Sequence, residues 1–156
     1  QNRSQRRFRP ASRLYDAHVS ECLPIAEFAF PGSLRDALVG AILDGSKTST
    51  TGLLEEYHRE GTPAEAVGAR ELVVDSAGRG VAVIETTESA VRRMRDVDLR
   101  FAIDEGEGFE TVEAWYEAHV RFFTSPETVA ALGEPPVPID GDTLVVCTRF
   151  RVIERL

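Results

Sequence analysis

Residues 45–52 read Gly45-Ser46-Lys47-Thr48-Ser49-Thr50-Thr51-Gly52, a run of hydroxyl side chains around a lysine, with a glycine at either end. Of the 18 lysine and arginine residues in the chain, Lys47 is the single lysine. Arginine stays charged at any usable pH, whereas a desolvated lysine amine can lose its proton and act as a base or nucleophile. Lys47 is therefore either a solvated charge after a helix, where a cation favours the helix dipole, or part of a site.

The segments around this run are predicted to alternate between helices and short strands. Apolar spacing predicts helices at 11–23, 34–44, 53–60 and 111–123, and strands at 28–30, 70–75, 80–87 and 143–154. Ser33 is expected to cap the second helix and Gly45 to end it, while 46–51 forms an extended strand or loop. Short strands with helices between them predict an α+β domain built on a small curled sheet or barrel.

The composition, with 42% hydrophobic and 28% charged residues, is that of an ordinary globular domain of 156 residues. No apolar run approaches the roughly 20 residues that cross a bilayer, so no membrane segment is expected. Cys22 and Cys147 lie in apolar contexts and are expected to be buried, reduced thiols of a cytoplasmic protein, with a disulfide as the alternative. His18, His58 and His119 show no ligand-type spacing with cysteine, so neither a metal nor a cofactor is predicted.

Charge is concentrated at the start of the chain. Residues 1–13 contain five arginines and no acid, although the net charge of the whole chain is −8. This arm either contacts phosphates or is a solvated tail. Because the remainder is acidic, a broad basic groove for nucleic acid is not expected, and the charge pattern favours a pocket for a small or single-stranded ligand.

A second informative segment is the acidic loop at 101–108, which ends in Glu105-Gly106-Glu107-Gly108. Its glycines allow the loop to fold tightly and to direct Glu107 inward. A carboxylate beside an amine and a hydroxyl can act as an acid/base set, but acids ahead of a helix also stabilise its dipole. In the helix that follows, Trp115 is expected in the core, and His119 is expected to be a packed residue of the inner face.

These segments match a known family in order. The matching pieces are the helix at 34–43 leading into Gly45-Ser46-Lys47-Thr48, then Val67-Gly68, the hairpin ending Val83-Ile84-Glu85-Thr86-Thr87, Asp96-Val97-Asp98, Phe101-Ala102, the acidic loop, Trp115–His119 and Val145–Val152. From about Phe28 onward the chain resembles the ASCH family, whose fold is a β-barrel related to the PUA RNA-binding domain. The resemblance implies an ASCH (PUA-like) domain over 26–156, with flanking helices, and the arginine-rich segment and the first predicted helix make residues 1–25 a separate N-terminal basic arm and helix.

The resemblance also implies a ligand site. RNA, or a nucleotide or nucleoside, is expected in a cleft lined by the Gly-Ser-Lys-Thr segment and the acidic Glu-Gly-Glu-Gly loop. The residues expected to contact this ligand are Ser46, Thr48, Glu105 and Arg149. The broader family motif carries an arginine where this chain has Gly52, which weakens the expectation of phosphate binding at that point.

Some members of the family resemble hydrolases, which gives the alternative function. They cleave RNA, as a ribonuclease does, or act as amidohydrolases on N4-acetylcytidine-like nucleosides. The amidohydrolase-like members use a lysine, a threonine three positions later and a glutamate, which match Lys47, Thr50 and Glu107. A neutral Lys47 would take the proton of Thr50, and Glu107 would protonate the departing amine. Alternatively, Glu107 pairs with Lys47, which then stays charged and stabilises an oxyanion or a phosphate.

Overall fold

The computed structural model describes residues 23–156. The basic arm, Cys22 and all but the last residue of the helix expected at 11–23 lie outside this range. Within it, the chain forms a mixed α+β fold around one sheet, as predicted. None of the helices in this range has the length and apolar character needed to span a bilayer.

The sheet has five strands within residues 23–156, in the order β1-β3-β4-β5-β2. β1 runs parallel to β3, and the other neighbours are antiparallel. The strands are β1 (Ile25–Ala26), β2 (Ser49–Leu53), β3 (Arg70–Val74), β4 (Gly80–Arg93) and β5 (Leu144–Arg155). The two edge strands, β1 and β2, do not pair in the described part of the chain, so the sheet is open and the expected barrel closure is not confirmed. β1 has two residues, too few to form a closing ladder.

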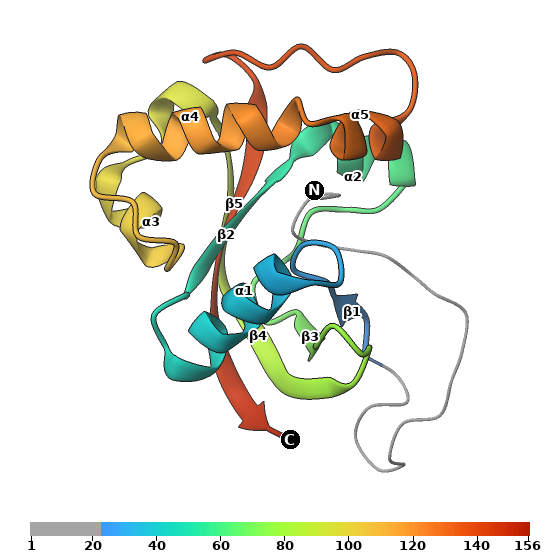
Figure 1. The fold of residues 1–156 in the computed structure, drawn as a ribbon, viewed down its shortest axis with the longest axis vertical. Helices are drawn as coiled ribbons and strands as arrows, with labels where there is room; N and C mark the ends of the chain where they lie inside the picture. The colour runs from blue at the N-terminus through green and yellow to red at the C-terminus, as the bar shows by residue number, and fades with distance from the viewer. Residues whose placement is uncertain (1–22) are drawn as a thin grey trace.

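Five α-helices flank the sheet in the described range (Figure 1). They are α1 (Ser33–Asp44), α2 (Leu54–Glu60), α3 (Leu99–Asp104), α4 (Val112–Phe123) and α5 (Pro126–Leu132), with a short 3-10 turn at Met94–Asp96. α1 ends at Gly45, which adopts a left-handed φ of +87° as predicted. α4 begins after Thr111, whose hydroxyl accepts a hydrogen bond from the Ala114 amide.

Three predictions about local structure were wrong. The strand expected at 28–30 is absent, because Phe28 fills the core and Ala29 turns the chain with a φ of +61°. Ser33 is the first helical residue rather than the cap, and the cap position is Gly32, whose amide donates to the Ser76 hydroxyl. β4 continues six residues beyond the predicted end at residue 87, because residues 88–93 pair with β5.

Of the three hydrophobic clusters in the described part of the chain, two pack helices against the sheet. One packs α1 and Phe28 against Ile84 and Phe150. The other packs α3 and α4, including Trp115, against Leu53 and the first residues of β5. Every residue of β2 is buried, and β2 follows directly from the run around Lys47. The lysine segment therefore enters the interior of the protein rather than its surface.

Candidate functional site

The lysine segment is tied to the end of α3 by its backbone. The Lys47 amide donates to the Ala41 carbonyl oxygen at 3.0 Å, and the Thr48 amide donates to the Asp104 carbonyl oxygen at 2.8 Å. The side chain of Lys47 is only 1% exposed. A solvated charge after a helix would be largely exposed, so that interpretation of Lys47 is wrong.

The ammonium of Lys47 is held between backbone carbonyls. Its Nζ donates to the Ser49 carbonyl oxygen at 2.9 Å and to the Glu105 carbonyl oxygen at 3.1 Å. The same Nζ lies 5.8 Å from the centroid of the Phe28 ring, within the range of a cation–π interaction. These contacts bring the lysine segment together with the acidic loop, as the sequence predicted.

Gly106 explains how the acidic loop approaches so closely. Its φ of +70° is left-handed, and a Cβ at this position would lie 2.8 Å from the backbone N and Cα of Lys47 and from the Ser46 carbonyl oxygen. Any other residue would combine an unfavourable backbone conformation with a backbone collision. The predicted need for glycine in this loop is thus met at Gly106.

Glu105 carries the central carboxylate of the site and is fully buried. Its Oε1 accepts a hydrogen bond of 2.5 Å from the Thr51 hydroxyl, and its Oε2 lies 3.1 Å from Nε2 of His119. Burial raises the pKa of Glu105, but the facing His119 and the nearby Lys47 charge outweigh burial and hold this pKa below its ordinary value. Glu105 is therefore a carboxylate at neutral pH, paired inside the protein.

His119 approaches this carboxylate from α4. It is 4% exposed and stacks on Trp115, with ring centroids 4.2 Å apart, so the prediction of a packed histidine on the inner face is confirmed. Its Nδ1 lies 2.8 Å from the Trp115 carbonyl oxygen, and its Nε2 faces Glu105. Burial lowers the pKa of His119, but Glu105 and the Trp115 carbonyl raise it by more than burial lowers it. The pKa of His119 therefore lies above its ordinary value. The sequence did not indicate this ion pair.

Glu107 is the third acid/base group of the cluster. It is half-buried, and one ligand-type atom from each of Glu105, Glu107 and His119 lies within 4.8 Å of the other two. Burial raises the pKa of Glu107 to about 7; the Glu105 charge adds to this effect and the Lys47 charge opposes it. A carboxyl group with this pKa can take or release a proton near neutral pH.

Thr50 and Thr51, the last two threonines of the lysine segment, point in opposite directions. In β2, Thr50 pairs with Thr148 and Thr51 pairs with Cys147 of β5. Successive strand residues face opposite sides of a sheet, so the buried Thr50 faces away from the side on which Thr51 meets Glu105. Thr51 was missed by sequence reasoning, although the period of two residues in a strand was a signal for it.

Of the other predicted contact residues, Ser46 is exposed at the end of α1 and Thr48 is half-buried. Arg149 lies on β5, where its Nη1 is 2.7 Å from Oδ2 of Asp104 and its Nε is 3.6 Å from Oε2 of Glu88. The guanidinium carbon of Arg149 is 5.3 Å from the centroid of the Phe101 ring. Arg149 is thus held over α3 by two acids and an aromatic ring.

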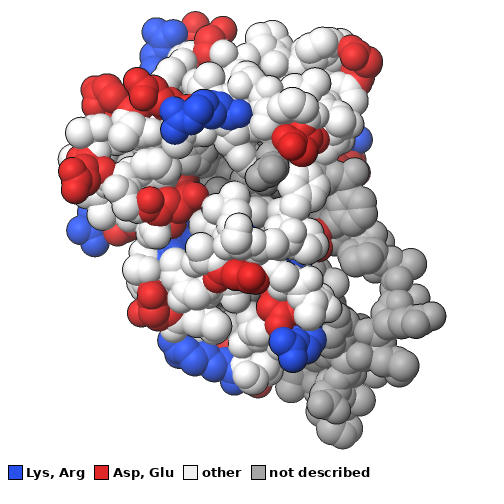
Figure 2. All heavy atoms as spheres, in the orientation of Figure 1, with Lys and Arg blue, Asp and Glu red and all other residues white. Residues whose placement is uncertain are grey.

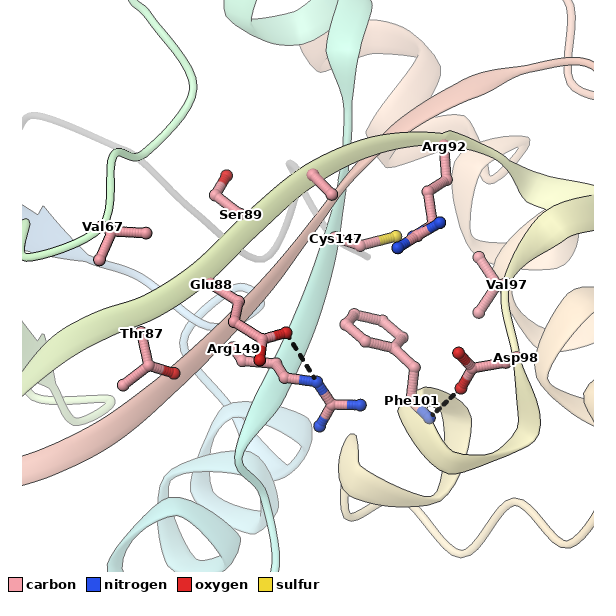
Figure 3. Close-up of a pocket in the computed structure, with 11 residues that line it drawn as sticks. Val67, Thr87, Glu88, Ser89, Arg92, Val97, Asp98, Phe101, Cys147 and Arg149 are labelled. Atoms are coloured by element: carbon pink, nitrogen blue, oxygen red, sulfur yellow. Dashed lines mark hydrogen bonds and ion pairs between the residues drawn. The ribbon is translucent and has the colours of Figure 1, made fainter.

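A cleft of about 420 Å³ opens beside this arginine, between β4, β5 and the start of α3 (Figure 3). Its lining residues are Val67, Thr87, Glu88, Ser89, Ala90, Arg92, Val97, Asp98, Phe101, Cys147 and Arg149. Figure 3 shows Arg92 and Arg149 reaching the cleft from different ends, with the Phe101 ring between them. Among the predicted site residues, all of which lie in the described range, Arg149 alone lines this cleft. The lysine segment and the acidic loop meet beside this cleft in a cluster in which Lys47 and Glu105 are buried.

Cys147 connects the cleft with that cluster. It lines the cleft, pairs with Thr51 across β2 and β5, and is a buried free thiol, as predicted. Burial, together with the Glu105 charge, raises the pKa of Cys147 to about 12. The cleft and the buried carboxylate are therefore close enough to interact electrostatically. Figure 2 shows acidic and basic side chains interspersed on the face in view, without a continuous basic surface there.

Comparison with known proteins identifies the family. The model of the ASCH domain family matches residues 26–154. The structure is similar to that of protein EF3133 from Enterococcus faecalis V583, assigned to the DUF984 family model, at 30% identity over 74% of this chain and 66% of that chain, with a TM-score of 0.64. It is also similar to an ASCH domain from Lactobacillus crispatus JV V101, at 29% identity over 76% of this chain and 71% of that chain, with a TM-score of 0.65. No curated protein matches the chain. The chain belongs to the ASCH domain family.

Proposed function

We propose that this protein binds RNA or a free nucleotide, and that one nucleotide unit occupies the cleft between β4, β5 and α3. The observation that carries the proposal is a cavity of about 420 Å³ with an arginine toward each end. Small-molecule sites typically measure about 300–1,000 Å³, so the cleft has room for a nucleotide. Membership of the ASCH family, which is thought to bind RNA, supports the same ligand class.

The two arginines suit the phosphate groups of such a ligand. A guanidinium group presents a planar fork of donors that matches phosphate oxygens, and it stays charged. Arg92 is exposed at the rim of the cleft and has room to turn toward a ligand. Arg149 is held in place by Asp104 and Glu88, so it would contribute a fixed donor direction.

The other walls suit a base and a sugar. Ser89 and Thr87 supply hydroxyls, and Val97 supplies an apolar surface. Asp98 accepts a hydrogen bond from the Phe101 amide through Oδ1, which leaves Oδ2 as an acceptor for an exocyclic amine or a hydroxyl. Single-stranded RNA exposes these base edges, whereas a duplex hides them in a deep groove. The interspersed charges in Figure 2 also favour a single strand over a duplex.

This proposal is tested by fluorescence anisotropy with a short labelled single-stranded RNA. Competition by a nucleoside monophosphate tests whether a free nucleotide binds in the same place. Arg92→Ala should weaken binding and reduce the slope of log affinity against log salt by about 0.7, the value for one phosphate contact on a single strand. Arg79→Ala is the matched control, because Arg79 is exposed on the β3–β4 turn away from the cleft. Equal affinities for the wild type and both variants would contradict a ligand in this cleft.

A second candidate function, hydrolysis of an N4-acetylcytidine-like nucleoside or of RNA, is favoured by one observation. The charge of Lys47 acts on the carboxyl group of Glu107, so two of the three residues named by the family resemblance lie in one buried cluster. For the acetylated nucleoside, a neutral Lys47 takes the proton of a threonine hydroxyl, and the threonine oxygen attacks the acetyl carbonyl carbon. Glu107 protonates the departing amine of the cytidine, and water then hydrolyses the acetyl-threonine ester to acetate. The threonine would be Thr50 by the resemblance, whereas Thr51 is the hydroxyl bonded to Glu105.

This candidate function is tested by incubating the protein with N4-acetylcytidine and with short RNA. Released cytidine and RNA fragments are measured separately. Thr50→Val and Thr51→Val keep the shape of the side chain and remove one hydroxyl each, so they identify which hydroxyl is needed. Lys47→Arg should abolish a proton-accepting role and partly preserve an anion-stabilising one. A wild-type protein that binds RNA without turning over either substrate would leave binding as the function.

A further inference from the structure

We propose that Glu105, Glu107 and His119 form a binding site for one divalent transition-metal ion, with Mn²⁺ as the reference ion. Neither binding of RNA in the cleft nor the Lys47-based hydrolysis requires such an ion, so the proposal goes beyond both. The side chains of Glu105 and Glu107, from the acidic loop, and of His119, from α4, meet next to the lysine segment.

The carrying observation is that three buried or half-buried side chains with ligand-type atoms converge on one point. Oε2 of Glu105, Oε2 of Glu107 and Nε2 of His119 are buried, and apart from the ion pair between Glu105 and His119 none of them has a hydrogen-bond partner among the described residues. Buried side-chain oxygen and nitrogen atoms almost always have such a partner. One ligand-type atom from each of these three residues lies within 4.8 Å of the other two, so a single cation could satisfy all three side chains.

The distance between the two buried residues of the cluster, Glu105 and His119, suits coordination of one ion. Oε2 of Glu105 and Nε2 of His119 are 3.1 Å apart. Two ligands bound at about 2.0–2.2 Å to one ion, at angles between octahedral and tetrahedral, lie about 3–3.5 Å apart. The distance therefore fits a shared ion as well as a direct ion pair. Glu107, half-buried between Gly106 and Gly108, needs only a side-chain adjustment to complete the set.

Contacts outside the cluster orient both rigid ligands. Nδ1 of His119 lies 2.8 Å from the Trp115 carbonyl oxygen, which places a hydrogen on Nδ1, so a bound ion would take the place of the Nε2 proton that faces Glu105. Oε1 of Glu105 accepts a hydrogen bond from Thr51, which directs Oε2 toward His119. A ligating histidine with a carbonyl partner and a ligating carboxylate with a hydroxyl partner are the usual supports of metal sites.

The nearby charges and the types of ligand atom determine which cations the cluster favours. Lys47 is the nearby cation, and its Nζ donates to carbonyl oxygens of Ser49 and Glu105. Its charge opposes an added cation, while the two carboxylates favour it. One imidazole and two carboxylates suit Mn²⁺, Fe²⁺ or Zn²⁺ better than Mg²⁺, which prefers oxygen ligands and keeps most of its water. With three protein ligands, coordination positions remain for water or an oxygen of a ligand.

The proposal is tested by isothermal titration calorimetry with MnCl₂, on the untagged full chain after treatment with a chelator. The electron paramagnetic resonance of Mn²⁺ reports the bound fraction. The wild type should bind one Mn²⁺. Glu107→Gln, at the half-buried position, should bind at least about tenfold more weakly, because one charged ligand is lost. Glu110→Gln is the matched control, an exposed acid of the same segment, and should bind as the wild type does.

His119→Gln provides a second variant that removes the nitrogen ligand, and circular dichroism shows whether each variant is folded. Absence of saturable binding by the wild type overturns the proposal. So does one-to-one binding that is unchanged in both Glu107→Gln and His119→Gln, because the ion would then lie elsewhere. The titration contains no RNA and measures no turnover, so its failure is separate from failure of the proposed function.

Discussion

Replacement of Gly106 by alanine tests the packing of the acidic loop on the lysine segment, on which the whole buried cluster depends. Alanine at a φ of +70° is expected to cost about 1–2 kcal/mol in backbone conformation alone. The added Cβ would also lie 2.8 Å from three backbone atoms of Ser46 and Lys47, closer than such atoms can approach. These atoms cannot move aside without lengthening the hydrogen bonds from the Lys47 and Thr48 amides, each contributing about 0.5–1.5 kcal/mol. Together, Gly106→Ala should lower the free energy of unfolding by about 2–5 kcal/mol.

Gly108→Ala provides the matched control in the same loop. Its φ of +84° carries the same conformational cost, but a Cβ there meets no atom within 4 Å in the described structure. The control should therefore lose only about 1–2 kcal/mol. Urea unfolding followed by circular dichroism measures both variants, and unchanged m-values make the comparison valid. If the two variants lose the same stability, the close approach of Gly106 to Lys47 is not present in solution and the reasoning fails.

Three further predictions concern the buried groups. Lys47→Met keeps most of the side-chain stem but removes the buried charge, and should lower the free energy of unfolding by about 3 kcal/mol in urea titrations; a change within about 0.5 kcal/mol would show that the amine is solvated. Trp115→Ala should cost about 3–5 kcal/mol and remove the ring on which His119 stacks, which thermal unfolding and near-ultraviolet circular dichroism report; a cost below about 1 kcal/mol would contradict its full burial. Cys147, with a pKa of about 12, should react with iodoacetamide at pH 8.5 about a thousandfold more slowly in the native protein than in the unfolded one, as peptide mapping by mass spectrometry can show. Equal rates would place the thiol in solvent.

The local elements of the fold were largely predictable, because their signals are short-range. A glycine after an apolar helix ends α1 at Gly45, and Thr111 begins α4 through a hydrogen bond three residues away. The hairpin of β3 and β4 follows from alternating apolar residues around a turn. Predictions failed where a sequence pattern is compatible with more than one local structure. The segment from Phe28 to Phe30 is as apolar as a buried strand, but Phe28 and Ala29 fill the core against α1 without pairing in the sheet. The second half of β4 carries exposed and charged residues, so its pairing with β5 left no apolar signal.

The candidate site divides in the same way. The sequence alone identified Lys47 as unusual and the acidic loop as a tight turn, because composition and glycine spacing are visible without coordinates. It determined the family for the same reason, through the order of short motifs. Tertiary structure alone decided that Lys47 contacts Glu105, 58 positions later, and that His119 and Thr51 complete the charge network. It also placed Arg149, and not Lys47, on the wall of the cleft between β4, β5 and α3. Burial and charge pairing depend on which distant segments pack together, and that packing is a property of the whole fold rather than of any local pattern.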